Sequence, residues 1–264
     1  MRNLRGPAAI GSSHPGRLIP AALLALLLSG CGGPPKLMGP TKSVLFIGNS
    51  LTYVNDLPHT LARLAASGGH PLVVDSFAPG GWQLHQDVES GEALAKIASR
   101  PWDYVVLQEQ SALPSIPADR EGLMYPAVRT LNGKIQAAGA QPLLFLTWGR
   151  KAGYPEIGYG DYPAMQDGLT EGYRGIAQEL GIPVVPVGLA WKTAHERQPD
   201  LALWGGDGLH PGPEGTYLAA CVFYAYLYRL SPEGLGYRLE LPRSEARFIQ
   251  RVAAGTVLGI PTVP

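Results

Sequence analysis

The chain has 264 residues, 45% of them hydrophobic, and its 21 basic residues balance its 21 acidic ones. Once an N-terminal targeting segment is removed, this length suits one α/β domain with a substantial core and leaves little room for a second domain. The even charge balance, without long runs of one sign, argues against nucleic-acid binding, which normally needs a basic stripe.

The N-terminus is typical of an exported protein. Three arginines precede an apolar stretch over residues 18–28. That stretch is about half of the ~20 residues that a membrane-spanning helix requires, so it indicates the hydrophobic region of a signal peptide.

The segment 28–31, Leu-Ser-Gly-Cys, resembles the bacterial lipobox, in which the cysteine thiol receives a diacylglycerol. We therefore expect a signal peptide with a lipobox over residues 1–31, lipidation at Cys31 and a flexible tether over residues 32–41. The implied location is the cell envelope, with the chain anchored to a membrane. An ordinary signal peptide with an incidental cysteine is the alternative.

Short apolar runs then alternate with stretches of helical spacing. The runs are 43–47, 72–77, 104–107, 142–147 and 183–187. Each is continuous rather than alternating, as expected for strands that are covered on both faces. Five such strands alternating with helices predict a five-stranded parallel sheet in a three-layer α/β/α sandwich.

The helical stretches include 57–65, 127–138 and 169–176, where apolar residues fall on one stripe. The segment 215–230 is apolar on nearly all sides and should form a buried helix. Cys221 lies within it, which favours a buried structural thiol over a nucleophile.

In parallel sheets of this kind, ligands bind outside the carboxyl ends of the strands. Glycine-rich or polar segments follow the predicted strands, so we expect them to meet at one rim. These segments are 48–52, 78–82, 108–111, 147–150 and 206–212.

The residues in these segments suggest acyl transfer. A serine hydroxyl becomes a nucleophile when an imidazole removes its proton, and the imidazole needs a carboxylate that fixes its tautomer. Ser50, His210 and Asp207 supply these groups if the loop holding the last two turns back on itself. Gly81 offers a backbone N–H to a developing oxyanion.

Each feature also has an ordinary structural interpretation. Ser50 could only cap a helix, the Asp-x-x-His segment could be a simple loop contact, and the glycine pair at 80–81 could be a turn. Their joint occurrence at strand ends favours the catalytic interpretation.

With these residues in view, the sequence resembles the SGNH (GDSL-like) hydrolases over residues 43–230. Residues 48–52 (Gly-Asn-Ser-Leu-Thr) match the first block of that family, Gly81 the second, and residues 207–211 (Asp-Gly-Leu-His-Pro) the last. The resemblance implies a flavodoxin-like hydrolase domain over 42–264 that works without a metal or cofactor. It also implies a catalytic triad, in which Ser50 is the nucleophile, His210 the base and Asp207 the carboxylate that orients the imidazole.

One block departs from the family pattern. Where the family has Gly-x-Asn, this chain has Gln-Glu-Gln-Ser at 108–111. Gln110 falls in the place of the asparagine and would complete an oxyanion hole with the N–H groups of Ser50 and Gly81. Gln108 could instead supply the amide, or the two backbone groups could suffice.

The resulting hypothesis is a carboxylic-ester hydrolase that acts on O-acetyl groups of glycans or on short acyl or lipid esters. An acyltransferase with the same triad and an inactive binding protein on the same fold are the alternatives. Trp82, Trp148 and Arg150 are candidates for the substrate wall. The sequence indicates neither the acyl group nor the oligomeric state.

Overall fold

The computed structural model describes residues 40–260, all of which lie in one compact unit over Leu37–Pro264. The predicted signal peptide with Cys31, and nearly all of the predicted tether, fall outside the described residues. Within the described range, no helix combines the length and the apolar character that crossing a membrane requires.

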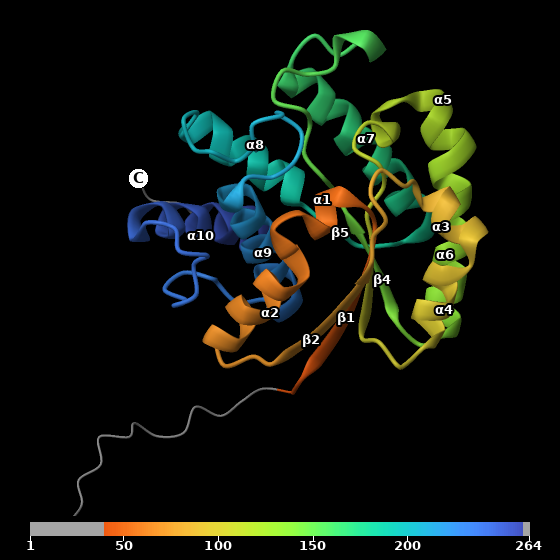
Figure 1. Ribbon diagram of the computed structural model, residues 1–264, viewed down its shortest axis with the longest axis horizontal. Coiled ribbons are helices and arrows are strands. Elements are labelled where there is room, and N and C mark those ends of the chain that lie inside the picture. The colour runs from red at the N-terminus through yellow and green to blue at the C-terminus, as the bar shows by residue number, and fades with distance from the viewer. Residues whose placement is uncertain (1–39, 261–264) are drawn as a thin grey trace, which may run out of the picture. The chain divides into compact units, whose positions relative to one another are not determined.

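A five-stranded sheet forms the middle layer (Figure 1). Its strands are β1 (Lys42–Ile47), β2 (Leu72–Phe77), β3 (Tyr104–Leu107), β4 (Gln141–Phe145) and β5 (Val184–Val185). All neighbouring strands are parallel, and their order is β2-β1-β3-β4-β5. The predicted sheet is therefore confirmed, in the flavodoxin-like order.

Two strands are shorter than predicted. β4 ends at Phe145, two residues early, and β5 has only two residues. Pro183 and Pro186 flank β5, and a proline has no backbone N–H to give to a neighbouring strand. The chain enters the next helix at Val187, directly after the second proline.

Helices cover both faces of the sheet. They are α1 (Ser50–Tyr53), α2 (Leu57–Ser67), α3 (Leu84–Ser90), α4 (Glu92–Ala98), α5 (Pro117–Asp119), α6 (Tyr125–Ala137), α7 (Tyr162–Leu180), α8 (Val187–Arg197), α9 (Pro213–Tyr228) and α10 (Arg243–Leu258). Short helical turns are η1 (Val54–Asp56), η2 (Leu113–Ser115), the π turn η3 (Arg120–Met124) and η4 (Pro155–Ile157). Helices α2, α8, α9 and α10 pack on one face, and α3, α4, α6 and α7 on the other (Figure 1).

The strands are apolar throughout because both of their faces are buried. In β1, Val44 and Phe46 belong to the core beside α9, while Leu45 and Ile47 belong to the core beside α6. All four side chains are fully buried, and each contributes roughly 1.5–3 kcal/mol through burial. The register of β1 is thereby fixed, and with it the position of the chain that follows.

The predicted buried helix is α9, which ends at Tyr228 because Arg229 adopts a left-handed conformation with φ of 54°. Cys221 is fully buried in it, as predicted, and burial raises the pKa of its thiol. Tyr217, one turn earlier, hydrogen-bonds through its hydroxyl to the carbonyl of Tyr237. This contact ties α9 to the loop that precedes α10.

Gly172 allows α7 to approach the loop after β3 closely. A Cβ at this position would collide with the carbonyl oxygen of Pro114 in η2. We expect Gly172→Ala to lower the free energy of unfolding by roughly 1–3 kcal/mol, since overpacking outweighs the better helix propensity of alanine. Urea unfolding measures the change.

Gly133 in α6 provides the matched control, because a Cβ there would meet nothing within 4 Å. Gly133→Ala should raise the free energy of unfolding by up to about 1 kcal/mol. Equal effects of the two substitutions would contradict the close approach of α7 to η2.

Candidate active site

Ser50 lies at the end of β1, as the first residue of α1. The preceding Asn49 caps this helix, and its Oδ1 accepts a hydrogen bond from the N–H of Leu51 at 3.2 Å. Gly48 must lack a side chain, because a Cβ there would lie 2.5 Å from Oε1 of Gln108. The Gly-Asn-Ser sequence thus allows a turn tight enough to present the serine above the sheet.

Gln108 supports this turn from below and is almost completely buried. Its Oε1 accepts hydrogen bonds from the N–H of Asn49 and the hydroxyl of Thr52, both at 2.9 Å. Its Nε2 donates to Oδ1 of Asn49 at 2.9 Å and to the carbonyl of Glu109. Since both polar atoms of the amide are engaged, Gln108 has no donor left for the space above Ser50.

The loop that carries Asp207 and His210 turns back on itself, as the sequence predicts. The N–H of Gly205 donates to the carbonyl of His210 at 2.8 Å, and that of Gly208 to the carbonyl of Gly205 at 3.1 Å. Gly208 has a φ of 66°, a conformation that favours glycine. The loop brings the carboxylate and the imidazole into contact although only two residues separate them.

Ser50, His210 and Asp207 form a continuous series of hydrogen bonds. Oγ of Ser50 lies 2.9 Å from Nε2 of His210, and Nδ1 of His210 lies 2.5 Å from Oδ2 of Asp207. The second oxygen of Asp207 accepts from the N–H groups of Leu209 and His210. The bond to His210 is the main cause that lowers the pKa of Asp207 to about 2, followed by the bond from Leu209. The carboxylate therefore stays ionised at neutral pH and can hold Nδ1–H.

The three residues expected to form the substrate wall, Trp82, Trp148 and Arg150, do not border the cavity beside Ser50. Trp148 is buried, stacks on Trp191 with ring centroids 4.0 Å apart, and donates through Nε1 to the carbonyl of Leu209. Its large apolar ring is thus a support beneath the His210 loop. Neither Trp82 nor Arg150 borders the cavity beside Ser50, so this prediction was wrong for all three residues.

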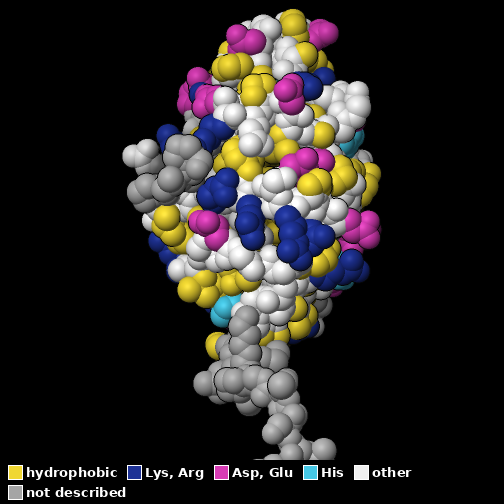
Figure 2. Space-filling view, turned by 90° about the vertical axis from the view of Figure 1, so that its left-hand side faces the viewer, with side chains coloured by type: hydrophobic (Ala, Val, Ile, Leu, Met, Phe, Trp, Pro, Cys, Tyr) yellow, Lys and Arg dark blue, Asp and Glu magenta, His cyan; other side chains and the backbone are white. Residues whose placement is uncertain are grey.

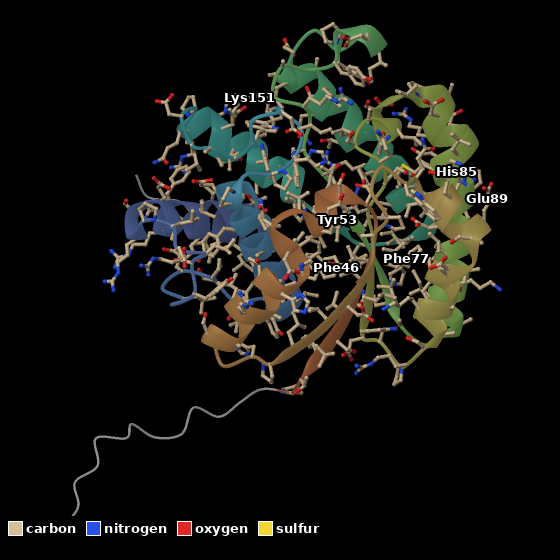
Figure 3. All side chains as sticks on the ribbon, viewed as in Figure 1. Phe46, Tyr53, Phe77, His85, Glu89 and Lys151 are labelled. Atoms are coloured by element: carbon tan, nitrogen blue, oxygen red, sulfur yellow. The ribbon has the colours of Figure 1, made fainter. Side chains whose placement is uncertain are left out.

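A cavity of about 330 Å³ opens beside Ser50. Tyr53, the last residue of α1, lies on the border of this cavity and is labelled in Figure 3. The described residues contain no group of three or more His, Cys, Asp and Glu side chains able to hold a metal ion. The residues bordering the cavity are Asn49, Ser50, Leu51, Tyr53, Gly80, Gly81, Gln110, Ser111, Leu209 and His210.

Two hydrogen-bond donors border this cavity without partners among the described residues. Gly81 has a φ of 75° and open space where a Cβ would be, so its N–H can be approached closely. Oε1 of Gln110 accepts from the N–H groups of Ala112 and Leu113 at 2.8 and 3.1 Å. These bonds fix the orientation of the amide and leave its NH₂ group free to donate.

A buried carboxylate, which the sequence analysis missed, joins the two segments that hold these donors. Oε1 of Glu109 accepts from the N–H of Gln110 at 2.7 Å and from the N–H of Leu84, the first residue of α3, at 3.1 Å. Glu109 and Asp87, one turn further along α3, are both fully buried. An acidic residue two positions beyond the end of an apolar strand was the available signal.

Burial raises the pKa of both carboxyl groups. The pKa of Glu109 rises to about 7, although its bonds from Gln110 and Leu84 oppose the shift. The pKa of Asp87 rises to about 8, through burial and then through the charge of Glu109. Neither oxygen of Asp87 has a hydrogen-bond partner in the described structure, so its ionised form is poorly accommodated.

We expect Asp87→Asn to stabilise the protein increasingly as the pH rises. A folded-state pKa of about 8, above the unfolded value of about 4, means that the contribution of Asp87 to stability is lost as the pH rises through this range. The Tm difference between variant and wild type should therefore grow from pH 5 to pH 8.5. Exposed Asp200, replaced by Asn, is the control that should follow wild type. Parallel Tm curves for wild type and Asp87→Asn would contradict the burial of an uncompensated acid.

The sequence matches no family model and no curated protein sequence. Similarity emerges at the level of structure. A protein from Slackia heliotrinireducens assigned to the SGNH hydrolases is 28% identical, with a TM-score of 0.61 over 71% of this chain and 100% of that one.

Two more distant structures share the fold. A DUF4886 family protein from Bacteroides uniformis is 19% identical, with a TM-score of 0.73 over 83% of this chain and 95% of that one. A lipase/acylhydrolase from Enterococcus faecalis is 16% identical, with a TM-score of 0.55 over 73% and 98% of the two chains. The chain therefore has the fold of the SGNH (GDSL-like) hydrolases, and the sequence blocks that resemble that family lie at the strand ends of this fold.

Proposed function

We propose that this protein hydrolyses carboxylic esters of small acyl groups, with Ser50 as the nucleophile. The observation that carries the proposal is the hydrogen-bonded series from Ser50 through His210 to Asp207 beside an open cavity. These three groups have the contacts that activation of a serine hydroxyl requires.

In the proposed reaction, Oγ of Ser50 attacks the ester carbonyl while Nε2 of His210 takes the hydroxyl proton. The same proton passes to the departing alkoxide when the tetrahedral intermediate collapses, which leaves an acyl-enzyme and a free alcohol. A water molecule then attacks the acyl-enzyme while Nε2 of His210 takes its proton. That proton returns to Oγ of Ser50 as the carboxylic acid is released. Ionised Asp207 accepts the hydrogen bond from Nδ1–H and stabilises the imidazolium formed in each half-reaction.

The negative charge of the tetrahedral intermediate needs donors that are already in place. We assign this role to the N–H groups of Ser50 and Gly81 and to the side-chain amide of Gln110. The support for Gln110 is that its oxygen is held by two backbone N–H groups, so its nitrogen is the end free to donate. The alternative residue, Gln108, already uses both hydrogens of its amide in hydrogen bonds to Asn49 and Glu109 below the turn.

The size of the cavity favours a short acyl group. About 330 Å³ lies near the lower end of the range for small-molecule sites, and its border mixes apolar Leu51, Tyr53 and Leu209 with the polar groups. Acetyl esters of glycans and other short acyl esters fit this space. Attachment to the envelope through a lipid on Cys31 remains our proposal from the sequence.

Ser50→Ala should reduce kcat/KM for p-nitrophenyl acetate by about 10⁴-fold or more, and His210→Ala by a similar factor, because the residues act as a unit. Asp207→Ala should cost less, since Asp207 positions the base. Ser50→Ala should also lose labelling by a fluorophosphonate probe. Its Tm should equal that of wild type, which would show that the loss comes from the missing hydroxyl and not from unfolding.

Ser111→Ala is the matched control, because Ser111 borders the same cavity but does not contact His210. It should keep its activity within about tenfold of wild type and still label with the probe. A wild-type protein that neither labels nor hydrolyses esters would indicate an inactive binding protein. Turnover retained in Ser50→Ala would exclude this nucleophile.

Gln110→Ala should lower kcat by roughly 10²–10³-fold with little change in KM, since the amide acts on charge that appears in the transition state. Gln110→Glu is the sharper variant, because it keeps the acceptor for Ala112 and Leu113 but removes the donor. It should retain the wild-type Tm and lose at least as much kcat. Activity near wild type in both variants would leave an oxyanion hole of backbone amides alone.

A further inference from the structure

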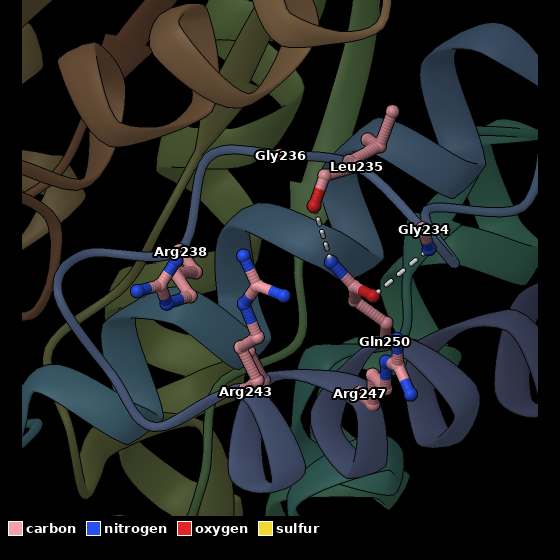
Figure 4. Close-up of a pocket in the computed structure, with 8 residues that line it drawn as sticks. Gly234, Leu235, Gly236, Arg238, Arg243, Arg247 and Gln250 are labelled. Atoms are coloured by element: carbon pink, nitrogen blue, oxygen red, sulfur yellow. Dashed lines mark hydrogen bonds between the residues drawn. The ribbon is translucent and has the colours of Figure 1, made fainter.

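A second cavity, of about 230 Å³, lies between α10 and the loop that precedes it (Figure 4). It shares no bordering residue with the cavity beside Ser50. Three arginines border it, Arg238 from the loop and Arg243 and Arg247 from α10. The proposed esterase reaction makes no use of this cavity.

The wall of this cavity is held by a buried amide. Gln250 of α10 is almost fully buried, and its Oε1 accepts from the N–H of Gly234 at 3.1 Å. Its Nε2 donates to the carbonyl of Leu235 at 3.2 Å and to the hydroxyl of Tyr217 on α9 at 2.8 Å. Figure 4 shows the two bonds to the loop. These hydrogen bonds attach the loop to α9 and α10 and thereby fix the backbone that carries the three arginines.

The three arginines lack acidic partners among the described residues. Nε of Arg238 donates to the carbonyl of Leu241 at 2.7 Å, which leaves its terminal nitrogens free. By contrast, Arg120 forms an ion pair with Glu171, and Arg129 makes a two-point contact with Glu179.

Arg243 and Arg247 are spaced four residues apart on α10, so their like charges repel each other in the absence of a counter-charge. Side chains four residues apart lie on the same side of a helix, and two like charges there repel each other and destabilise the helix. Both side chains are exposed, and neither forms an ion pair with an acidic side chain of residues 40–260.

Positive charge extends beyond the cavity itself. Arg63 of α2 borders an adjoining hollow together with Arg238, where Glu240 is the acidic residue on the border. Figure 2 looks onto the side of the molecule where α10 lies and shows Lys and Arg side chains gathered there. The arginines outnumber the acid at this place, although the whole chain carries no net charge.

We propose that this cavity binds a phosphate group. A single guanidinium satisfies a carboxylate by a two-point contact, whereas three guanidinium groups around one space match a tetrahedral dianion with several free oxygens. The volume exceeds that of several water molecules, each of which occupies about 30 Å³, so a phosphate with part of its ester group fits. The phosphate can belong to a free phosphate ester or to a lipid headgroup.

The test uses inorganic pyrophosphate and isothermal titration calorimetry on the full chain in detergent. Wild type should bind pyrophosphate, and acetate at matched ionic strength should not displace it. Arg243→Gln and Arg247→Gln should each weaken binding about tenfold, and the double variant should abolish it. Hydrolysis of p-nitrophenyl acetate should stay unchanged in these variants, which separates this site from the proposed function.

Arg174→Gln is the matched control, because Arg174 is an exposed arginine of α7 outside both cavities. It should bind pyrophosphate like wild type. Absence of binding by wild type, or equal binding by wild type and the double variant, would overturn the proposal.

Vesicle flotation distinguishes the two sources of phosphate. Vesicles of phosphatidylcholine alone and vesicles containing phosphatidic acid offer any N-terminal lipid anchor the same hydrocarbon interior, so the difference in binding between them reports on the headgroup. A difference that disappears in Arg243→Gln/Arg247→Gln assigns the cavity to a headgroup. Arginine-dependent binding of pyrophosphate without such a difference assigns it to a soluble phosphate ester. A difference that persists in the double variant would show that the cavity is not the phosphate site.

Discussion

One buried amide, the side chain of Gln108, joins the ends of β1 and β3 beneath the nucleophile turn. These two strands are neighbours in the sheet although β2 lies between them in sequence. The chain leaves them toward opposite faces, so their ends border the crevice where parallel sheets bind ligands. Hydrogen bonds in such a dry interior are strong, and a partner lost there would leave a buried polar group unsatisfied. The position of Ser50 therefore depends on a residue that the substrate does not reach.

Two further contacts hold the rest of the rim in a similar way. Glu109 joins the segment after β3 to the start of α3, and Trp148 holds the His210 loop from the end of β4. Both supports lie just beyond a strand end, and each is hydrogen-bonded to a residue that borders the cavity, Glu109 to Gln110 and Trp148 to Leu209. The rim is thus arranged before any ligand arrives, which is the condition under which fixed donors stabilise developing charge most effectively.

The fold was predictable because its strands are buried on both faces. β2 and β3 match the predicted limits, since continuous apolar runs between helical stretches leave few alternatives. The limits of β5 were not predictable from apolar character, because proline interrupts its hydrogen bonding. Helices α3 and α4 have only seven residues each, too few for a clear helical period, and the sequence analysis did not identify them.

In the site, residues with a chemical signature were found and residues with a supporting role were not. Asp207, His210 and Ser50 carry groups whose chemistry is evident, and the structure places them in contact. Trp148 was misplaced because a large aromatic at a strand end can face the cavity or the core, and only the packing against Trp191 decides between them. The end of β3 was predicted correctly, but residues two apart along a strand lie on the same side, so this pattern could not separate Gln108 from Gln110.

The distance along the chain between Ser50 and His210 has a consequence for biosynthesis. Their contact joins residues 160 positions apart, one just after the first strand and the other beyond the last. During synthesis from the N-terminus, Ser50 is made early and His210 only after all five strands. Contacts of such long range form late in folding, because closing the chain between them costs entropy that only the completed sheet returns. In the mechanism proposed above, an incomplete or unfolded chain would thus carry an ordinary serine, and its hydroxyl would become reactive only once folding is complete.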